Sequence, residues 1–106
     1  MNKQPALFTQ KVREIAKSVP SGKVVTYGML AKAAGGGGQA ARSVSSVLAK
    51  DPEYKKIPFH RIVYSDGRVW CNDSGDSDRI RKLKKEGVAI DKKGKIVNLH
   101  DYLLFD

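Results

Sequence analysis

The sequence predicts an α+β domain of the winged-helix type, in which a helix-turn-helix is followed by a β-hairpin wing. Apolar residues recur at helical spacing in two short segments, 27–34 and 39–50, which are separated only by a glycine-rich turn. An apolar run at 57–64 followed by an Asp-Gly turn indicates the hairpin. Since 106 residues suit one compact core, we expect 1–106 to form a single domain.

The first predicted element is an amphipathic helix from Leu7 to Val19, which the group Pro20-Ser21-Gly22 ends. The two valines at 24 and 25 are too few for more than a short extended piece. Thr26 then stands where an N-cap is needed for a helix from Tyr27 to Ala34, and the four glycines that follow end it.

The third helix, predicted from Gln39 to Lys50, has two contrasting faces. One face carries an apolar stripe expected to pack in the core, formed by Ala40, Val44, Val47 and Leu48. The opposite face presents Arg42 among short side chains, including Ser45 and Ser46, that would let the backbone approach a surface closely. We therefore expect Arg42, Ser45 and Ser46 to contact DNA from the second helix of the motif.

The wing is predicted from a strand at Ile57–Tyr64, a turn at Ser65-Asp66-Gly67-Arg68 and a return through Val69 and Trp70. Asp-Gly is a common turn of two-residue hairpin loops. We expect the wing to lie beside the helix pair.

The remaining chain adds a short basic helix capped by Ser77 or Asp78 and ended by Gly87. Its charged cluster, Arg79 to Lys85, is predicted to be a solvated face with phosphate contact as a secondary role. A second hairpin is expected around Asp91–Gly94, and the apolar tail Leu99–Phe105 is expected to pack back on the core.

Charge and composition indicate which classes of partner, location and cofactor to expect. Twenty Lys and Arg against eleven Asp and Glu give a net charge of +9, which favours a nucleic-acid partner over a merely basic surface. No apolar run is long enough for a membrane span or a secretory leader, so we expect a soluble, cytoplasmic protein, or a nuclear one in a eukaryote. One cysteine and two histidines predict no disulfide, metal or cofactor, and the lack of heptads suggests a monomer.

Three patches resemble the DNA-binding domain of the O6-alkylguanine-DNA alkyltransferases: Val24–Ala31, Ala40–Val44 and Ile57–Val63. The catalytic Pro-Cys-His-Arg of that family appears here as Pro58-Phe59-His60-Arg61, so the thiolate that accepts the alkyl group is missing. In this the chain is similar to the alkyltransferase-like proteins, which carry tryptophan or another residue at that position.

The resemblance implies a function and a site. The chain would bind O6-alkylguanine in double-stranded DNA by base flipping, without catalysis, and flag it for nucleotide excision repair proteins. Arg42 would be the finger that fills the space of the flipped base, and Tyr27 would press on the flanking phosphate. The alkylguanine pocket would be formed by Tyr27, Phe59, Trp70 and Asn72.

Other residues of the motif are given different roles. His60 has no thiol to activate, so we expect a structural histidine, and Arg61 is expected to hold nearby backbone carbonyls. Asp51 stands where the enzymes carry a hinge asparagine. Asn72 replaces a basic residue that helps the alkyltransferase-like proteins to recognise the modified guanine, so lesion preference is altered or lost.

Two alternatives stay open at this level. An ordinary winged-helix regulator would read undamaged sequence, and in such a protein Tyr27 and Phe59 would be core aromatics and Arg42 a solvated cation. A residual alkyltransferase would work through Cys71, twelve residues beyond Phe59, provided that its surroundings lower the thiol pKa.

Overall fold

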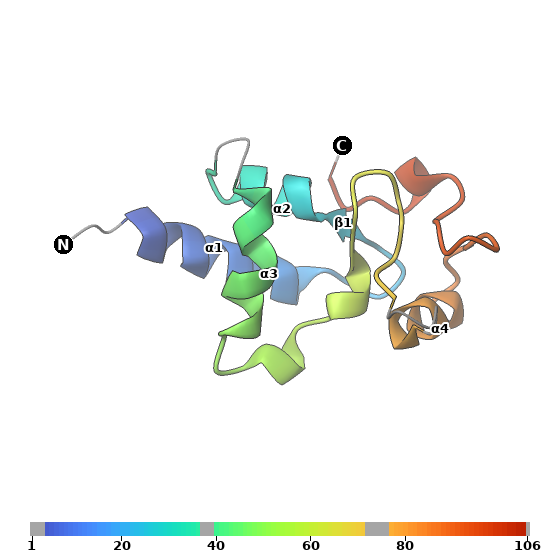
Figure 1. The fold of residues 1–106 in the computed structure, drawn as a ribbon, viewed down its shortest axis with the longest axis horizontal. Coiled ribbons are helices and arrows are strands. Elements are labelled where there is room, and N and C mark those ends of the chain that lie inside the picture. The colour runs from blue at the N-terminus through green and yellow to red at the C-terminus, as the bar shows by residue number, and fades with distance from the viewer. Residues whose placement is uncertain (1–3, 37–39, 72–76, 106) are drawn as a thin grey trace.

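The computed structural model describes residues 4–36, 40–71 and 77–105, with only the backbone of 4–6. Within these residues the chain is an α+β fold, as predicted, with one short parallel sheet (Figure 1). Its elements in order are α1 (Gln4–Ser18), β1 (Val25–Thr26), α2 (Tyr27–Ala33), α3 (Ala41–Ala49), the 3-10 helices η1 (Tyr54–Lys56) and η2 (Phe59–Arg61), β2 (Ile62–Val63), α4 (Asp78–Lys85) and the 3-10 helix η3 (Leu99–Asp101).

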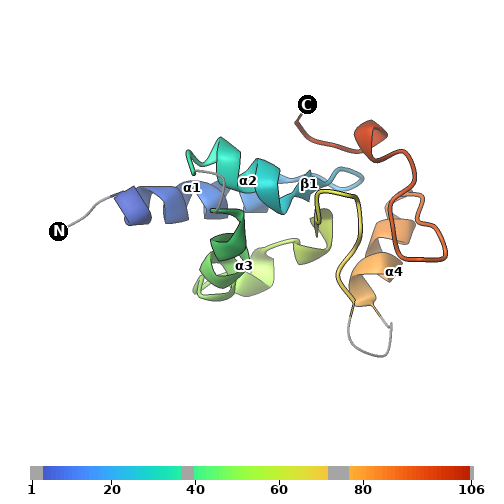
Figure 2. The same cartoon turned by 45° about the horizontal axis from the view of Figure 1, so that its top comes forward.

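A first apolar cluster is built by α1, α2 and α3, with α3 crossing α1 (Figures 1 and 2). Val12 and Leu30 are fully buried in it, together with Val44 and Leu48 of the predicted α3 stripe. Ala40 and Val47 complete the stripe as partly buried neighbours of the cluster, so the predicted core face of α3 is confirmed.

The start and end of α2 follow from local chemistry. Thr26 is the N-cap, as predicted, and its hydroxyl oxygen accepts a hydrogen bond from the backbone N–H of Met29 at 3.0 Å. After the helix, a Cβ on Gly36 would lie 2.5 Å from Cβ of Ala40 and 2.7 Å from the ring of Phe8. Glycine is therefore required where the end of α2 passes close to α1 and to the start of α3.

The strand predicted at 57–64 is wrong over most of its length. Only Ile62–Val63 is extended, and it pairs in parallel with β1 through Val25↔Ile62 and Thr26↔Val63. Residues Phe59–Arg61 form η2 instead. Pro58 has no N–H for a ladder, and the side chains of the two residues after Phe59 turn toward Glu86, which favours a compact turn over a strand.

The predicted wing forms at its turn, where the N–H of Tyr64 donates to the carbonyl of Arg68 at 3.0 Å, but it is corrected beyond the turn. Within the turn, the N–H of Gly67 (φ +91°) donates to the carbonyl of Tyr64 at 2.8 Å. The returning arm, however, pairs with the C-terminal part of the chain, through an antiparallel bridge between Arg68 and Lys95 and a 2.9 Å bond from the N–H of Val69 to the carbonyl of Gly94. Val69 is only 5% exposed and is buried in a second apolar cluster. This burial accounts for the pairing of the returning arm with the C-terminal segment.

The second cluster joins the C-terminal segments to the sheet. Helix α4 begins at the predicted cap, where the oxygen of Ser77 accepts from the N–H of Ile80 at 3.2 Å, and it buries Leu83. The predicted turn at 91–94 is confirmed by the antiparallel bridge between Ile90 and Ile96. The tail packs back as expected, since Leu103 bridges Val24.

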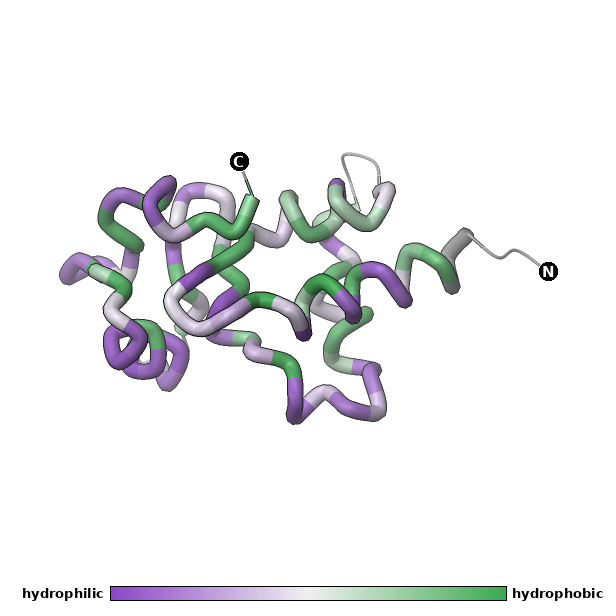
Figure 3. Tube along the Cα trace, turned by 180° about the vertical axis from the view of Figure 1, so that it is seen from behind, coloured by the Kyte–Doolittle hydropathy of each residue, from purple (hydrophilic) through white to green (hydrophobic). Residues whose placement is uncertain are grey.

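Most residues of α4 and of the turn that follows it are hydrophilic (Figure 3). None of the described helices is long and apolar enough to cross a membrane.

The cap of α2 gives a test of the fold. Replacing Thr26 with valine keeps the side-chain shape but removes the oxygen that accepts from Met29. We expect Thr26→Val to lower the free energy of unfolding by about 1 kcal/mol, measured by urea denaturation. Thr9→Val, at a half-buried threonine within α1, is the matched control with an expected change below about 0.5 kcal/mol. Equal losses in the two variants would contradict the capping role.

Candidate nucleic-acid interface

Three hollows adjoin one another, the middle one sharing lining residues with each of the other two. We call them the α3 hollow (about 460 Å³), the aromatic pocket (about 370 Å³) and the basic groove (about 670 Å³). The α3 hollow and the aromatic pocket share Tyr27, Ser45 and Tyr64. The aromatic pocket and the basic groove share Phe59, Trp70 and Arg79.

The α3 hollow brings together the predicted DNA-contacting residues of two helices. Arg42, in the first turn of α3, and Ser45, nearly one turn later, are both exposed and line it together with Tyr27 of α2. Its opposite wall is the turn that carries Tyr64 and Arg68. Ser46 is exposed on α3 but lines none of the three hollows.

The lining of the aromatic pocket includes four aromatic residues. Its lining consists of Tyr27, Ser45, Leu48, Ala49, Phe59, Tyr64, Trp70 and Arg79. The rings of Tyr27 and Tyr64 lie 5.5 Å apart between centroids, and Phe59 packs against the first apolar cluster from η2. Three of the four predicted pocket residues therefore line one cavity, and the fourth, Asn72, lies outside the described residues.

Arg79 of α4 lies over this pocket, and the sequence reasoning missed it. Its guanidinium carbon is 5.0 Å from the centroid of Trp70 and 5.6 Å from that of Phe59, and Nη1 donates to the hydroxyl of Tyr27 at 3.3 Å. These are cation–π distances. The predicted solvated face is thus wrong for Arg79, which is half-buried, and Tyr64 was missed as well.

No local signal distinguishes Arg79 from the other cations of α4. The Ser77 cap fixes where the helix begins, and the spacing of Ile80 and Leu83 shows which face is apolar. Neither observation shows that the aromatic rings of Phe59 on η2 and Trp70 on the returning arm lie beside the first turn of α4.

Glu86, directly after α4, joins the turn that contains Gly22 and the 3-10 helix η2 to the end of α4. Its carboxylate accepts from the backbone N–H of Gly22 at 3.0 Å, from Nη2 of Arg61 at 2.7 Å, and lies 2.7 Å from Nε2 of His60. Arg61 also donates from Nη1 to the carbonyl of Val19 at 2.9 Å. His60 and Arg61 thus make structural contacts, although both also line the basic groove.

Two opposing effects set the pKa of Glu86. Burial by itself would raise this pKa, but the hydrogen bonds from Arg61, Gly22 and His60 outweigh it and lower the value from 4.5 to about 2. The carboxylate is therefore charged throughout the neutral range.

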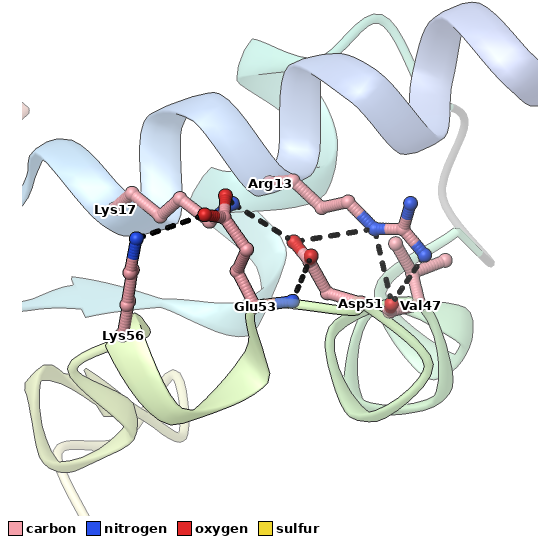
Figure 4. Close-up of polar contacts among 6 residues, drawn as sticks. All are labelled: Arg13, Lys17, Val47, Asp51, Glu53 and Lys56. Carbon is pink, nitrogen blue, oxygen red and sulfur yellow. Dashed lines mark hydrogen bonds and ion pairs between the residues drawn. The ribbon is translucent and has the colours of Figure 1, made fainter.

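A second polar cluster fixes the C-terminal end of α3 to α1 (Figure 4). Asp51, at the position expected for a hinge residue, is buried and lies 3.2 Å from Nζ of Lys17 and 3.5 Å from Nε of Arg13. Arg13 also donates to the carbonyl of Val47 at 3.2 Å. A hydrogen bond from the N–H of Glu53, aided by the charges of Lys17 and Arg13, holds the pKa of Asp51 below its ordinary value.

Cys71 is exposed and lines none of the three hollows. Its position gives no support to the alternative in which it acts as the nucleophile.

Comparison with known proteins finds a family model and several relatives that match this chain. A model described as the DNA-binding domain of 6-O-methylguanine DNA methyltransferase matches residues 7–88. A DNA base-flipping protein of Escherichia coli strain K12 is 37% identical over 89 residues, covering 84% of this chain and 68% of that protein. Alkyltransferase-like protein 1 of Schizosaccharomyces pombe is 32% identical over 85 residues, 78% of each.

A solved structure shares the fold. The crystal structure of S. pombe Atl1 in complex with damaged DNA containing O6-carboxymethylguanine superposes with a TM-score of 0.74 at 29% identity. The match covers 93% of this chain and 95% of the other.

The low pKa of Glu86 predicts a pH-dependent stability. Because the folded-state pKa of about 2 is below the ordinary 4.5, the contribution of Glu86 is full above pH 4.5 and is lost as the pH falls toward 2. The shift corresponds to about 3 kcal/mol. Between pH 5 and 2 we expect the free energy of unfolding of the natural chain to fall by about that much more than that of Glu86→Gln.

Denaturant titrations at each pH make this measurement. Glu14→Gln, at an exposed glutamate of α1, should keep the pH profile of the natural chain. Parallel profiles for the natural chain and Glu86→Gln would show that the carboxylate contributes nothing beyond its shape.

Proposed function

The chain belongs to the family of the 6-O-methylguanine DNA methyltransferase DNA-binding domain, and we propose that it binds O6-alkylguanine in duplex DNA by base flipping, without alkyl transfer. The observation that carries this proposal is the aromatic pocket with Phe59 in its wall, in the Pro-Phe-His-Arg segment where the alkyltransferases carry cysteine. Among the described residues that line it, the pocket offers rings for stacking and no thiol.

Base flipping requires a group to replace the extruded base, and Arg42 is the candidate. It is exposed at the start of α3 and lines the α3 hollow, which adjoins the aromatic pocket. Ser45 lines both hollows, and its short side chain lets the DNA backbone approach. We infer that Tyr27, which also lines both hollows, contacts the strand from which the base leaves.

The energetics are consistent with recognition that needs no covalent step. Extruding a base costs a few kcal/mol, and less where alkylation has already weakened its pairing. Stacking on aromatic side chains returns about 1 to 3 kcal/mol per base. Phe59 and Trp70 supply such rings in the pocket.

Alkyl transfer requires a thiolate beside a base that activates it. Phe59 has no sulfur, so His60, which Glu86 holds at 2.7 Å, has no thiol at the neighbouring position to activate. Exposed Cys71 lies outside the three hollows.

The downstream role rests on the resemblance to alkyltransferase-like proteins. We infer that the bound chain marks the lesion for nucleotide excision repair proteins, acting as a monomer. It would do so in the cytoplasm of a prokaryote or the nucleus of a eukaryote.

The proposal is tested with two duplexes that differ by a single O6-methylguanine. We expect fluorescence anisotropy at near-physiological salt to give about tenfold tighter binding to the lesion, because flipping costs less there. Mass spectra of protein and DNA should be unchanged afterwards. Equal affinities would leave only a general DNA-binding module, and an alkylated Cys71 would establish a residual alkyltransferase.

Arg42→Ala tests the finger. We expect it to remove most of the preference for the lesion while weakening binding to intact DNA no more than about twofold, because phosphate contacts from many cations supply non-specific affinity. Lys50→Ala, at the exposed C-cap of α3, removes the same charge and is the matched control. It should weaken binding to the two duplexes by the same factor. Equal losses on the two duplexes with Arg42→Ala would contradict the finger role.

A further inference from the structure

A cationic turn at residues 91–95, which we call the lysine turn, has no part in the proposed flipping mechanism. It carries Lys92, Lys93 and Lys95, whose side chains are all exposed, and it lines none of the three hollows. Against these three positive charges the turn has the single carboxylate of Asp91. The turn therefore presents a net positive charge to a partner that approaches this part of the surface.

The backbone of the lysine turn is held in one shape by Asp91. Oδ1 of Asp91 accepts from the N–H of Lys93 at 2.8 Å and from that of Lys95 at 3.0 Å. Gly94 (φ +81°) supplies the left-handed conformation in the turn. The carboxylate thus serves the backbone of its own turn, and no ion pair joins Lys92, Lys93 or Lys95 to an acidic residue that the structure describes.

Two contacts fix the lysine turn beside the wall of the α3 hollow. Lys95 forms an antiparallel bridge with Arg68, which belongs to that wall. The turn also lies against α4, since a Cβ on Gly94 would be 3.3 Å from Cδ1 of Ile80. The lysines are therefore held at a defined position relative to the hollow.

The elements that carry these cations follow one another along the long dimension of the molecule. In Figures 1 and 2 the turn at 65–68 lies between α3 and the segment that contains the lysine turn. Exposed Arg42 lies on α3 and exposed Arg68 on the turn between them. A duplex that meets α3 and passes over the wall of its hollow would next reach the lysine turn.

The chemistry of the lysine turn suits a phosphate backbone better than a protein surface. Lysine is depleted in protein–protein interfaces, which have apolar and aromatic centres, whereas flexible cations are typical phosphate contacts. The isoleucines that flank the turn do not supply such a centre, because Ile96 is only 4% exposed and Ile90 packs against the second apolar cluster. Val97 is exposed nearby, and a single exposed apolar side chain is ordinary on a protein surface.

We propose that the lysine turn binds phosphates of the duplex to one side of the flipped base and so extends the DNA contact that begins at α3. The inference rests on the DNA-binding part of the proposed function and does not require a lesion. Each phosphate contact steepens the plot of log affinity against log salt concentration by about 0.9. We expect the turn to supply about two such contacts and about a tenfold gain in affinity at physiological salt.

The first experiment removes the charges of the turn with the variant Lys92→Gln/Lys93→Gln/Lys95→Gln. Because these side chains are exposed, the variant should unfold at the same urea concentration as the natural chain. We expect it to bind a guanine duplex and its O6-methylguanine twin about tenfold more weakly, by the same factor. Its salt plot should be less steep by about 2.

The matched control is Lys11→Gln/Lys23→Gln/Lys32→Gln, which removes three charges from exposed lysines that line none of the three hollows. It should change the salt slope by less than about 1. Equal affinities and equal slopes for the two triple variants would overturn the proposal, because net charge alone would then explain the loss.

The second experiment locates the contact on the DNA. The full duplex has arms of about 12 base pairs on each side of the O6-methylguanine, or about 40 Å at a rise of about 3.4 Å per base pair. Two shorter duplexes keep only about 4 base pairs on one side or the other, about 14 Å. We expect the natural chain to bind one short duplex about tenfold more weakly than the other, and the variant of the lysine turn to bind the two equally. Equal affinities of the natural chain for the two short duplexes, with the lesion preference intact, would overturn the proposal.

The two hypotheses fail separately in this design. Equal binding of the natural chain to guanine and O6-methylguanine rejects the proposed function, and the salt slopes on the guanine duplex still decide the role of the lysine turn. An intact lesion preference with equal slopes for the two triple variants rejects the role of the lysine turn alone.

Discussion

The carboxylate of Glu86 is the contact on which the site depends. It gathers the turn after α1, through the N–H of Gly22, and η2, through His60 and Arg61, at the C-terminal end of α4. Phe59 precedes His60 on η2, and Arg79 lies on α4, so the two elements that carry these lining residues are joined through this one group. A charge so little exposed is tolerated only because several donors surround it.

The site lies where two apolar clusters meet. Tyr27 and Phe59 pack against the cluster of α1, α2 and α3, whereas Trp70 follows Val69, which is buried in the cluster of α4 and the C-terminal segments. Concave sites are common at such boundaries, because two packed bodies leave a gap between their curved surfaces. The Asp51 cluster holds α3 at one side of this boundary by tying its end to α1 (Figure 4).

Phe59 shows how the proposed function separates recognition from reaction. In that proposal the exposed Arg42 and the aromatic pocket serve binding and flipping, which do not require a nucleophile. With an aromatic ring at the cysteine position, the proposed site binds by stacking in place of covalent chemistry. Function in this family thus follows from the residues placed in the site and cannot be taken from the fold alone.

The sequence by itself determined the helices, their caps at Thr26 and Ser77, the buried stripe of α3 and the motif that contains Phe59, because each depends on neighbours a few residues away. Tertiary structure decided the rest. The parallel pairing of β2 with β1 joins residues 62 and 25, and the position of Arg79 over Phe59 and Trp70 depends on where α4 is held. Periodicity shows which face of an element is apolar, but the surface that this face meets is set by packing between distant segments.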